Sequence, residues 1–249
     1  MTSTANEPAI LYRDDHIVVV NKPAGMAVHR SRLVGRDDGY LVDWLREALR
    51  QPAYLAHRID RATSGCVLLA LDKEAVSTLG EAFMSREVAK SYLAVVRGWP
   101  EPPDALIDHP IDGGPGKLEK REARTRYQTL GRAEIEVAVG AHPTARYALL
   151  ECQPETGRYR QIRRHLKHIS HHLIGDTSHG DGRHNRVFRM LGVHRMLLHA
   201  WRLGFEHPVK GRRIAVEAPL DMGFKRAISS LGLDVQRPDG IARTVGRQD

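Results

Sequence analysis

Short apolar runs constrain the fold of this 249-residue chain more than any other feature. The run "HIVVVNKP" (16–23) is rich in β-branched residues and ends at a proline, which is typical of a strand. Similar runs predict strands at 53–57, 65–71, 90–99, 122–139, 145–153, 195–206 and 212–217. Apolar residues at helical spacing predict helices at 41–50, 72–86, 157–169 and 224–233. Strands outnumber helices without alternating with them, so we expect an α+β fold with a mixed, mostly antiparallel central sheet flanked by helices and loops.

The charge of the chain favours a polyanionic partner. Lys and Arg number 38 against 30 Asp and Glu, which gives a net charge of +8 and a pI of about 9.7. Such a balance is typical of proteins that bind nucleic acid, although a soluble basic protein with no such partner is the alternative. The two cysteines, Cys66 and Cys152, lie in separate apolar runs, so we expect neither a disulfide framework nor a CxxC metal site.

The sequence gives no sign of export or membrane insertion. The first residues, "MTSTANEPAI", lack the basic start and apolar stretch of a signal peptide. The apolar runs are long enough for strands but too short to cross a bilayer. We therefore expect a cytoplasmic protein that has no contact with membranes.

The stretch "AHRIDRATSGCVLLAL" (56–71) places one carboxylate between two cations. Asp60 lies between Arg58 and Arg61, at the point where two apolar runs meet. One interpretation is a simple turn, because Asp, Thr, Ser and Gly are all good turn residues. The other is a functional carboxylate that neighbouring positive charge keeps ionised. Such a group can attack a sugar carbon or stabilise positive charge that develops there.

The segment "GRYRQIRRHLKHI" (157–169) predicts a strongly basic helix. Its residues Ile162, Leu166 and Ile169 share one face and should pack on the core. The basic residues of another face are Arg160, Arg164, Lys167 and His171, with Arg163 at their flank. This face could follow a phosphate backbone, or it could simply be solvated.

No metal or cofactor is expected. His165, His168, His171 and His172 cluster in the sequence, but there is no HExxH motif and no obvious carboxylate ligand among basic neighbours. The chain also lacks a GxGxxG or GxxxxGK[ST] sequence, so nothing indicates a dinucleotide or a P-loop nucleotide site.

Together these segments resemble the RluA-type pseudouridine synthases. "HRIDRATSG" (57–65) is similar to the catalytic motif of that family, which is typically HRLDxxTSG. The other matching segments follow in the family's order, namely "NKPAGMAVHRS" (21–31), "KSYLAVVRG" (90–98), "TGRYRQIRRHL…LIGDTSHGD" (156–181) and "MLLHAWRL" (196–203). The resemblance runs from about Ile10 to Leu220 and implies the pseudouridine synthase catalytic fold.

The resemblance also implies a domain organisation. It crosses the Pro- and Gly-rich residues 100–120, which we therefore interpret as an insert loop within a single catalytic domain, 10–233. Many relatives carry an S4-like RNA-binding module before this domain, and we expect none here. Residues 1–9 and 234–249 are expected to be a flexible N-terminus and a flexible tail.

The family's catalytic residues map onto three positions. The resemblance implies that Asp60 is the essential aspartate, which acts on the ribose C1′ or draws a proton from C2′. Tyr92 would stack on the uracil and help to remove the proton from C5, and Arg163 would pair with Asp60. The expected substrate-binding residues are Arg58, which would fill the gap left by a flipped nucleotide, Leu197 or Leu198 as a wall of the uracil pocket, and Arg61, Arg160, Arg164 and Lys167.

The chemistry that the resemblance implies agrees with the missing cofactor motifs. Isomerising uridine breaks the N1–C1′ bond, turns the base and joins C5 to C1′, with no exchange of electrons. "VHRS" (28–31) and "GDTSHGDGRHNR" (175–186) resemble the branch of the family that modifies a uridine in the T stem of tRNA, at position 65. We thus expect an RNA partner, tRNA in particular, and a monomer without an obligate protein partner.

Three alternatives to this activity stay open at the level of sequence. The chain could modify a uridine in 23S ribosomal RNA with the same chemistry, or bind RNA without catalysis. A glycoside hydrolase would require two carboxylates, and the sequence offers only Asp60 in a motif setting.

Overall fold

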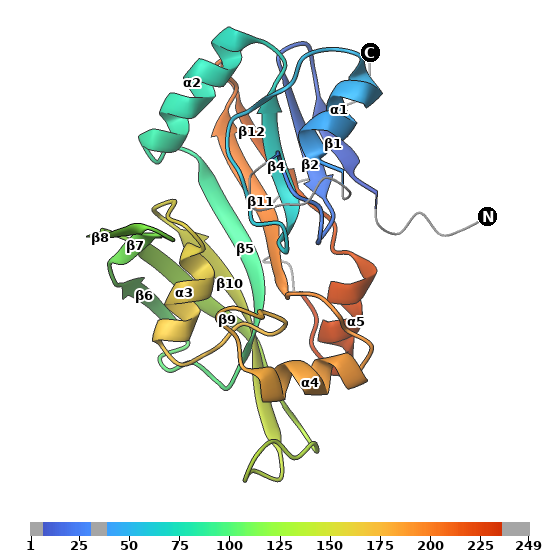
Figure 1. Ribbon diagram of the computed structural model, residues 1–249, viewed down its shortest axis with the longest axis vertical. Helices are drawn as coiled ribbons and strands as arrows, with labels where there is room; N and C mark the ends of the chain where they lie inside the picture. The colour runs from blue at the N-terminus through green and yellow to red at the C-terminus, as the bar shows by residue number, and fades with distance from the viewer. Residues whose placement is uncertain (1–6, 31–38, 236–249) are drawn as a thin grey trace, which may run out of the picture.

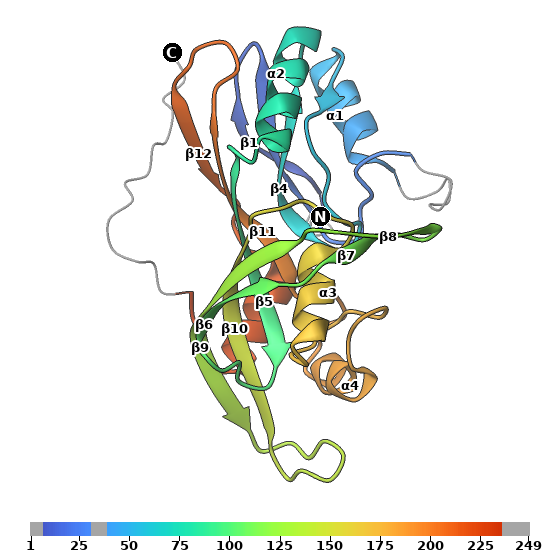
Figure 2. The same ribbon diagram turned by 90° about the vertical axis from the view of Figure 1, so that its left-hand side faces the viewer.

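The computed structural model describes residues 7–30 and 39–235. Most of the segments expected to be flexible, 1–9 and 234–249, lie outside the described residues, as does Ser31 of the first family-like segment. A ten-stranded sheet runs along the longest axis of the molecule (Figures 1 and 2). Its strands are β1 (Ala9–Arg13), β2 (Ile17–Lys22), β3 (Tyr54–Leu55), β4 (Ser64–Ala70), β5 (Ala89–Arg97), β6 (Asp104–Asp108), β9 (Arg124–Ile135), β10 (Ala145–Pro154), β11 (Leu198–Glu206) and β12 (Arg213–Glu217).

The strand order is β1-β2-β4-β11-β5-β10-β9-β6, with β3 beside β4 and β12 beside β11. Among the described strands, the pairing of β4 with β11 is parallel and every other pairing is antiparallel. The expected α+β fold with a mixed, mostly antiparallel sheet is therefore confirmed. A separate two-stranded hairpin consists of β7 (Ile111–Gly114) and β8 (Lys117–Arg121).

Five helices cover the sheet in the described part of the chain: α1 (Leu41–Leu49), α2 (Lys73–Met84), α3 (Gln161–His168), α4 (Gly182–Met190) and α5 (Met222–Ser230). Side chains of β5 alternate between the two faces of the sheet, as the period of a strand requires. Leu93 and Val95 pack with apolar residues of α4 and α5, whereas Ala94 and Val96 pack with residues of α3. One half of the sheet is thus enclosed between α3 on one face and α4 with α5 on the other (Figures 1 and 2).

The other half of the sheet is covered by α1 and α2. Val18 and Val20 of β2 pack against α1, whereas Ile17 and Val19 pack against α2. A short polar residue just before a helical run of apolar residues predicts an N-cap, and Asp72 holds that position ahead of α2. Its side chain caps the helix by accepting a hydrogen bond from the backbone of Ala75 at 2.7 Å. Within the described ranges, no helix is both long and apolar enough to cross a membrane.

Two parts of the structure differ from the expectation. Residues 100–120, interpreted as a loop, contain β6, β7 and most of β8. Each residue of β8 is exposed, so this strand carries no apolar alternation that a sequence pattern could detect. Helix α4 was also not expected, because its first turn holds Gly182, Arg183 and His184, and only two apolar residues, Val187 and Phe188, are buried.

Gly65 allows the two halves of the sheet to meet. It pairs with Ala200 where β4 runs parallel to β11, and its φ is +108°. A Cβ at this position would lie 2.1 Å from the carbonyl oxygen of Ala200. Only glycine combines this backbone conformation with such a close approach. The glycine that ends "HRIDRATSG" therefore fixes where the strand after Asp60 begins.

We predict that Gly65→Ala lowers the free energy of unfolding by about 3–5 kcal/mol, because it adds a steric clash to an unfavourable φ. Urea titration followed by circular dichroism would measure the loss. Gly80→Ala is the matched control. Gly80 lies inside α2 with nothing within 4 Å of an added Cβ, so this change should stabilise the protein by about 0.5–1 kcal/mol. Equal effects of the two substitutions would contradict the role of Gly65.

Candidate active site

Asp60 lies in the loop that joins β3 to β4, and backbone contacts hold this loop in place. The carbonyl of Asp60 accepts a hydrogen bond from the amide of Thr63 at 3.0 Å, which closes a turn. The carbonyl of Arg61 accepts from the amide of Gly25 at 2.8 Å and from Lys22 Nζ at 3.1 Å. The loop is therefore tied to the turn that follows β2.

The guanidinium of Arg163 connects Asp60 to a second carboxylate. Arg163 Nη1 donates to Asp60 Oδ2 at 2.7 Å, and Nε and Nη2 donate to Asp176 Oδ2 and Oδ1 at 2.6 and 2.8 Å. The side chains of Arg163 and Asp176 are 6% and 0% exposed, whereas that of Asp60 is 27% exposed. Arg163 is thus held from behind by a buried carboxylate and offers one N–H to a carboxylate that solvent can reach.

This arrangement keeps Arg163 and Asp176 charged. Burial alone would favour the protonated form of Asp176, but hydrogen bonds from Arg163 hold the pKa of Asp176 below its ordinary value. Burial likewise opposes the charge of Arg163, and its hydrogen bonds to Asp176 and Asp60 outweigh burial and raise the pKa of Arg163. A charged pair is stable in such a site because the remaining oxygens of the carboxylate are also hydrogen-bonded.

Asp176 is itself positioned by its neighbours. Its Oδ1 accepts from the backbone amides of Ser178 and His179 at 2.8 and 2.9 Å. Asn185 of α4 donates from Nδ2 to the carbonyl of Asp176 at 2.9 Å, and its Oδ1 accepts from the amide of Gly175 at 2.7 Å. Neither Asp176 nor Asn185 is among the site residues that the sequence predicts. Both belong to family-like segments, but no local charge pattern distinguished them.

Tyr92 lies on β5 opposite Ala200 of β11 and is partly buried. Burial and then the negative charge of Asp60 raise the pKa of the Tyr92 phenol, so the hydroxyl is neutral at physiological pH. The ring packs in the same apolar cluster as Leu198. Leu197 belongs to the cluster on the opposite face of the sheet, so of the two leucines only Leu198 shares a face with Tyr92.

Lys22 is a further charged group at the base of the loop that carries Asp60. Its side chain is fully buried, and Nζ donates to the carbonyls of Pro23, Met26 and Arg61 at 2.8, 2.8 and 3.1 Å. Burial, chiefly, and the charge of Arg195 lower the pKa of Lys22 to about 7, and the charge of Asp60 opposes them. Lys22 belongs to the family-like segment "NKPAGMAVHRS", but the sequence does not predict it as a site residue.

A second hydrogen-bonded cluster lies where β4 meets β11. Arg195 Nη2 donates to Ser64 Oγ at 2.9 Å, and the Arg195 guanidinium also pairs with Asp221. His199 Nε2 donates to the carbonyl of Ala218 at 3.1 Å, so its Nδ1 accepts from the Ser64 hydroxyl at 2.7 Å. Burial lowers the pKa of His199 to about 4, which keeps this ring neutral at physiological pH.

The arginines expected to bind substrate lie in different settings. Arg58 is exposed and makes no hydrogen bond or ion pair with any described residue, whereas Arg61 donates from Nε to the carbonyl of Gly25 at 2.7 Å. Arg160 precedes α3 with a left-handed φ of +52°, and its guanidinium lies 4.9 Å from the ring centre of Tyr159.

The basic residues of α3 do not form one exposed row. Arg163 points inward to the two carboxylates. Arg164 is partly buried and donates to Asp112 of β7 at 2.6 Å, so it secures the β7–β8 hairpin. Lys167 is exposed. The structure therefore brings Asp60, Tyr92, Arg163 and Leu198 towards one another and leaves Arg58 and Lys167 free to meet a ligand.

Comparison with known proteins decides the family. A family model described as RNA pseudouridylate synthase matches residues 16–168, which include Asp60, Tyr92 and Arg163. The chain belongs to the RNA pseudouridine synthases. Members of this family are isomerases.

Several relatives of this family are similar over most of the chain. The tRNA pseudouridine synthase C of Vibrio cholerae is 40% identical over 233 residues, which cover 90% of this chain and 95% of that protein. The tRNA pseudouridine synthase C of Pectobacterium carotovorum subsp. carotovorum is also 40% identical over 233 residues. The match covers 90% of this chain but only 62% of that longer relative. The solved structure of human RNA pseudouridylate synthase domain containing 4 superimposes with a TM-score of 0.71 at 26% identity, covering 92% of this chain and 94% of that one.

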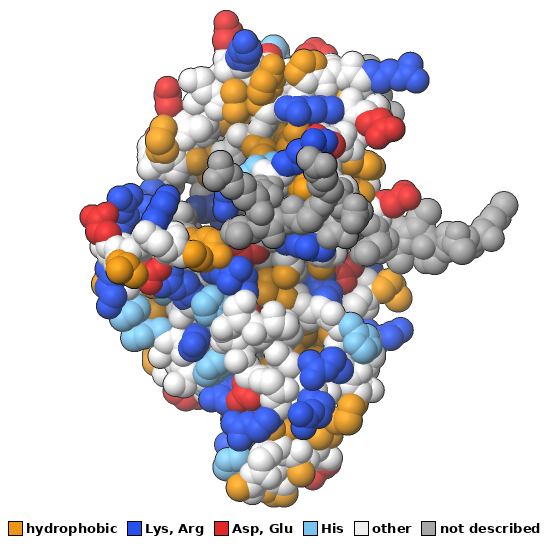
Figure 3. Space-filling model, viewed as in Figure 1, with side chains coloured by type: hydrophobic (Ala, Val, Ile, Leu, Met, Phe, Trp, Pro, Cys, Tyr) orange, Lys and Arg blue, Asp and Glu red, His pale blue; other side chains and the backbone are white. Residues whose placement is uncertain are grey.

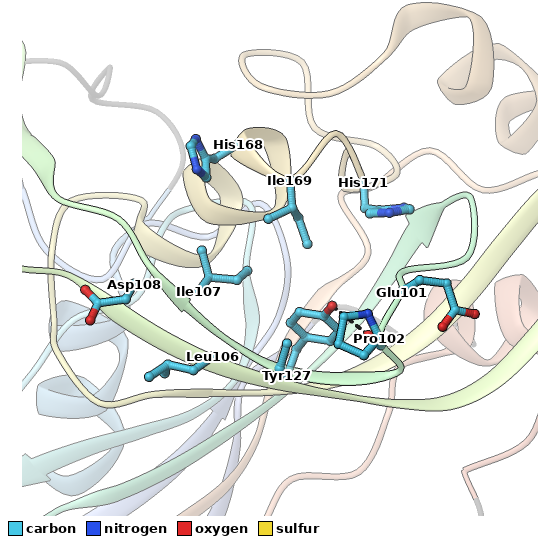
Figure 4. Close-up of a pocket in the computed structure, with 10 residues that line it drawn as sticks. Glu101, Pro102, Leu106, Ile107, Asp108, Tyr127, His168, Ile169 and His171 are labelled. Atoms are coloured by element: carbon cyan, nitrogen blue, oxygen red, sulfur yellow. Dashed lines mark hydrogen bonds between the residues drawn. The ribbon is translucent and has the colours of Figure 1, made fainter.

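One groove of this pseudouridine synthase lies apart from Asp60. Its volume is about 350 Å³, and it lies between β6 and β9 on one side and the end of α3 on the other (Figure 4). Tyr127 spans its floor and donates from its hydroxyl to the carbonyl of Pro102 at 2.8 Å. None of the residues that bring Asp60, Tyr92 and Arg163 together lines this groove, so it is not part of the candidate active site.

The clustered histidines each contact a different group within the fold. His165 Nε2 donates to the carbonyl of His109 at 3.0 Å, and the ring of His168 stacks on that of His109 at 3.7 Å. His171 Nδ1 lies 2.9 Å from the carbonyl of Arg97. Across residues 7–30 and 39–235, no group of three or more His, Cys, Asp or Glu side chains is placed to hold a metal ion.

The lowered pKa of His199 predicts an acid-sensitive fold. An unfolded chain takes up a proton on this histidine near pH 6.5, whereas the folded protein takes it up only near pH 4. The contribution of His199 is therefore complete above pH 6.5 and is lost as the pH falls towards 4, by up to about 1.4 kcal/mol per pH unit. Urea titrations from pH 7.5 to 4.5 should show this slope in wild type and a shallower one in His199→Gln. Identical slopes would show that His199 is not held neutral.

Proposed function

We propose that this chain isomerises a uridine of tRNA to pseudouridine, with Asp60 as the catalytic carboxylate. The observation that carries the proposal is the Arg163 guanidinium, which donates to Asp60 and is fixed by the buried Asp176. A carboxylate that must act at a sugar carbon has to stay ionised once RNA covers it, and a lone buried carboxylate would tend to take up a proton. Arg163 supplies the compensating charge.

The remaining contacts fit the steps of the reaction. Asp60 would attack C1′ or withdraw a proton from C2′, and either step lets the N1–C1′ bond break while the uracil stays bound. The detached base must then turn so that C5 faces C1′. Tyr92 and Leu198 share one face of the sheet near Asp60 and would form the walls against which the base turns. After the C5–C1′ bond forms, the neutral Tyr92 hydroxyl would assist removal of the C5 proton as a relay, passing its own proton to solvent as it accepts the one from C5.

Access to the base requires that the nucleotide leave its stack. Unstacking costs a few kcal/mol, so a group that fills the vacated space offsets part of the cost. Arg58 lies two residues before Asp60, is exposed, and has no partner among the described residues. We propose that its guanidinium takes the place of the flipped nucleotide.

The identity of the RNA is proposed from the relatives. Those at about 40% identity over 90% of this chain are tRNA pseudouridine synthases C, and the net charge of +8 fits an RNA substrate. We propose the uridine at position 65, in the T stem, as the target. We also propose that residues 10–233 act as one catalytic domain, since the ten-stranded sheet includes strands from β1 to β12.

We predict that Asp60→Asn abolishes turnover, a loss of more than about 10⁴-fold, while tRNA binding and the unfolding temperature change little. Arg163 keeps its two hydrogen bonds to Asp176 in this variant, which preserves the fold around the site. Tritium release from C5-labelled uridine would be measured with unmodified tRNA and, in parallel, with ribosomal RNA.

Asp104→Asn is the control for the same chemical change, because Asp104 is an exposed carboxylate on β6. Wild-type activity in Asp60→Asn would overturn the mechanism. Release from ribosomal RNA alone would keep the mechanism and overturn the tRNA substrate. No release from either RNA would favour an RNA-binding protein without catalysis.

Two substitutions of Tyr92 distinguish the contribution of its ring from that of its hydroxyl. Tyr92→Phe should lower single-turnover rates by about 10²–10⁴-fold, the usual range for a lost acid–base group, with tRNA affinity unchanged. Tyr92→Leu should reduce affinity for the substrate as well, because the stacking surface is gone. Full activity of Tyr92→Phe would show that the hydroxyl takes no part in proton removal.

A further inference from the structure

Helix α4 presents a row of arginines that the reaction at Asp60 does not use. Arg183, Arg186 and Arg189 recur every third residue and are all exposed. The first of them pairs with Asp181 at 3.2 Å. The side chains of Arg186 and Arg189 form no hydrogen bond or ion pair with any residue in the described ranges. The row extends about 9 Å along the helix axis, at 1.5 Å per residue.

The surroundings of this row are also basic. Between residues 177 and 197 the only acidic residue is Asp181, and Arg97 already binds that carboxylate at 2.5 Å. Arg226 of α5 lies beside the end of α4 and donates to the carbonyl of Gly192 at 3.4 Å. Figure 3 shows Lys and Arg side chains gathered over the lower part of this face, where Figure 1 places α4. The potential at this surface is therefore positive.

The opposite side of α4 is fixed to the body of the protein. Val187 and Phe188 are buried in the cluster that α4 shares with β5 and β10. The hydroxyl oxygen of Tyr147, on β10, lies 3.1 Å from Nδ1 of His184. Asn185 holds the backbone of Gly175 and Asp176, and Asp176 in turn holds Arg163. The arginine row is thus rigidly connected to the group that pairs with Asp60.

We propose that α4 is a docking surface for the sugar–phosphate backbone of the substrate tRNA, at a distance from the nucleotide that is flipped. Arg186 and Arg189 would neutralise phosphates, and Arg183 and Arg226 would add to the field. The inference deepens the proposed function and rests on it, because it takes tRNA as the occupant.

A phosphate backbone fits this surface better than a protein partner does. Apart from Met190, the exposed side chains of α4 are guanidinium groups, which bind phosphate through paired N–H donors. A folded RNA presents regularly spaced phosphates that a straight, rigid helix can follow, and contacts of this kind fix the register of the RNA without reading its sequence. The surface would therefore add to the affinity for tRNA without touching the nucleotide that reacts at Asp60.

The test compares two double substitutions that remove equal charge. Arg186→Ala with Arg189→Ala removes the two unpaired arginines of α4. Arg13→Ala with Arg213→Ala removes two exposed arginines on β1 and β12 that likewise have no side-chain partner in the described part of the chain. Arg13 precedes the turn between β1 and β2, and Arg213 follows the turn between β11 and β12. A contact between His207 and Asp14 joins these two turns, which lie at the end of the molecule away from α4 (Figure 1). The dissociation constant for unmodified tRNA would be measured over a range of KCl concentrations, together with the single-turnover rate at saturating tRNA.

We expect the α4 variant to raise the dissociation constant about tenfold and to reduce the slope of log affinity against log salt by about 2, one for each lost phosphate contact. Its rate at saturating tRNA should equal that of wild type, and the control variant should match wild type in all respects. Unchanged affinity and slope in the α4 variant, or equal losses in both variants, would overturn the inference while leaving the proposed function intact. Failure of wild type to modify tRNA would instead overturn the proposed function, and failure to bind tRNA would overturn both.

Discussion

The ion pair between Arg163 and its two carboxylates is the interaction on which the site depends. Three segments meet there: the first turn of α3, the turn before α4, and the loop before β4, which lies 103 residues from Arg163 in the chain. A guanidinium that is 6% exposed is stable only while its carboxylate partners are in place, because removing one leaves a buried charge uncompensated. The fully buried Asp176 fixes the position of the Arg163 guanidinium. Of the two carboxylates that pair with Arg163, only Asp60 is exposed enough for a substrate to reach.

The sheet brings the parts of this site together by a single parallel pairing in the described structure. Asp60 precedes β4 and Tyr92 lies on β5, and between these strands runs β11, which begins at Leu198. Gly65 permits the close approach of β4 to β11, and Ser64 adds hydrogen bonds to His199 and Arg195 across the same junction. The polar residues at this junction therefore position the loop of Asp60 relative to the strand of Tyr92.

The basic residues of the chain divide into two groups with different tasks. Arg163 and Arg195 are largely buried, are paired with carboxylates and act within the fold. Arg58, Lys167 and the unpaired arginines of α4 are exposed and are available to RNA. Each ion pair cancels one positive and one negative charge, so the net charge of +8 is carried by groups outside the pairs, such as these exposed cations.

The sequence by itself determined the α+β class, the N-cap at Asp72, the place of Asp60 between two strands and the family. These features depend on local order: the period of apolar residues, the capping preference of a short polar side chain, and contiguous motifs. It also led to the pairing of Arg163 with Asp60, but only through the family resemblance, since 103 residues separate the two.

Only the tertiary structure decided that Asp176 holds Arg163, that Arg164 binds the β7–β8 hairpin rather than joining an exposed row, and that Leu198 rather than Leu197 shares a face with Tyr92. It also revealed α4, whose polar sequence hides a helix that is held by Asn185 and two buried apolar residues. Each of these outcomes depends on which distant segments come into contact. A side chain's partner across the fold is set by packing and by the need to pair buried charge, and neither can be obtained from the spacing of residues along the chain.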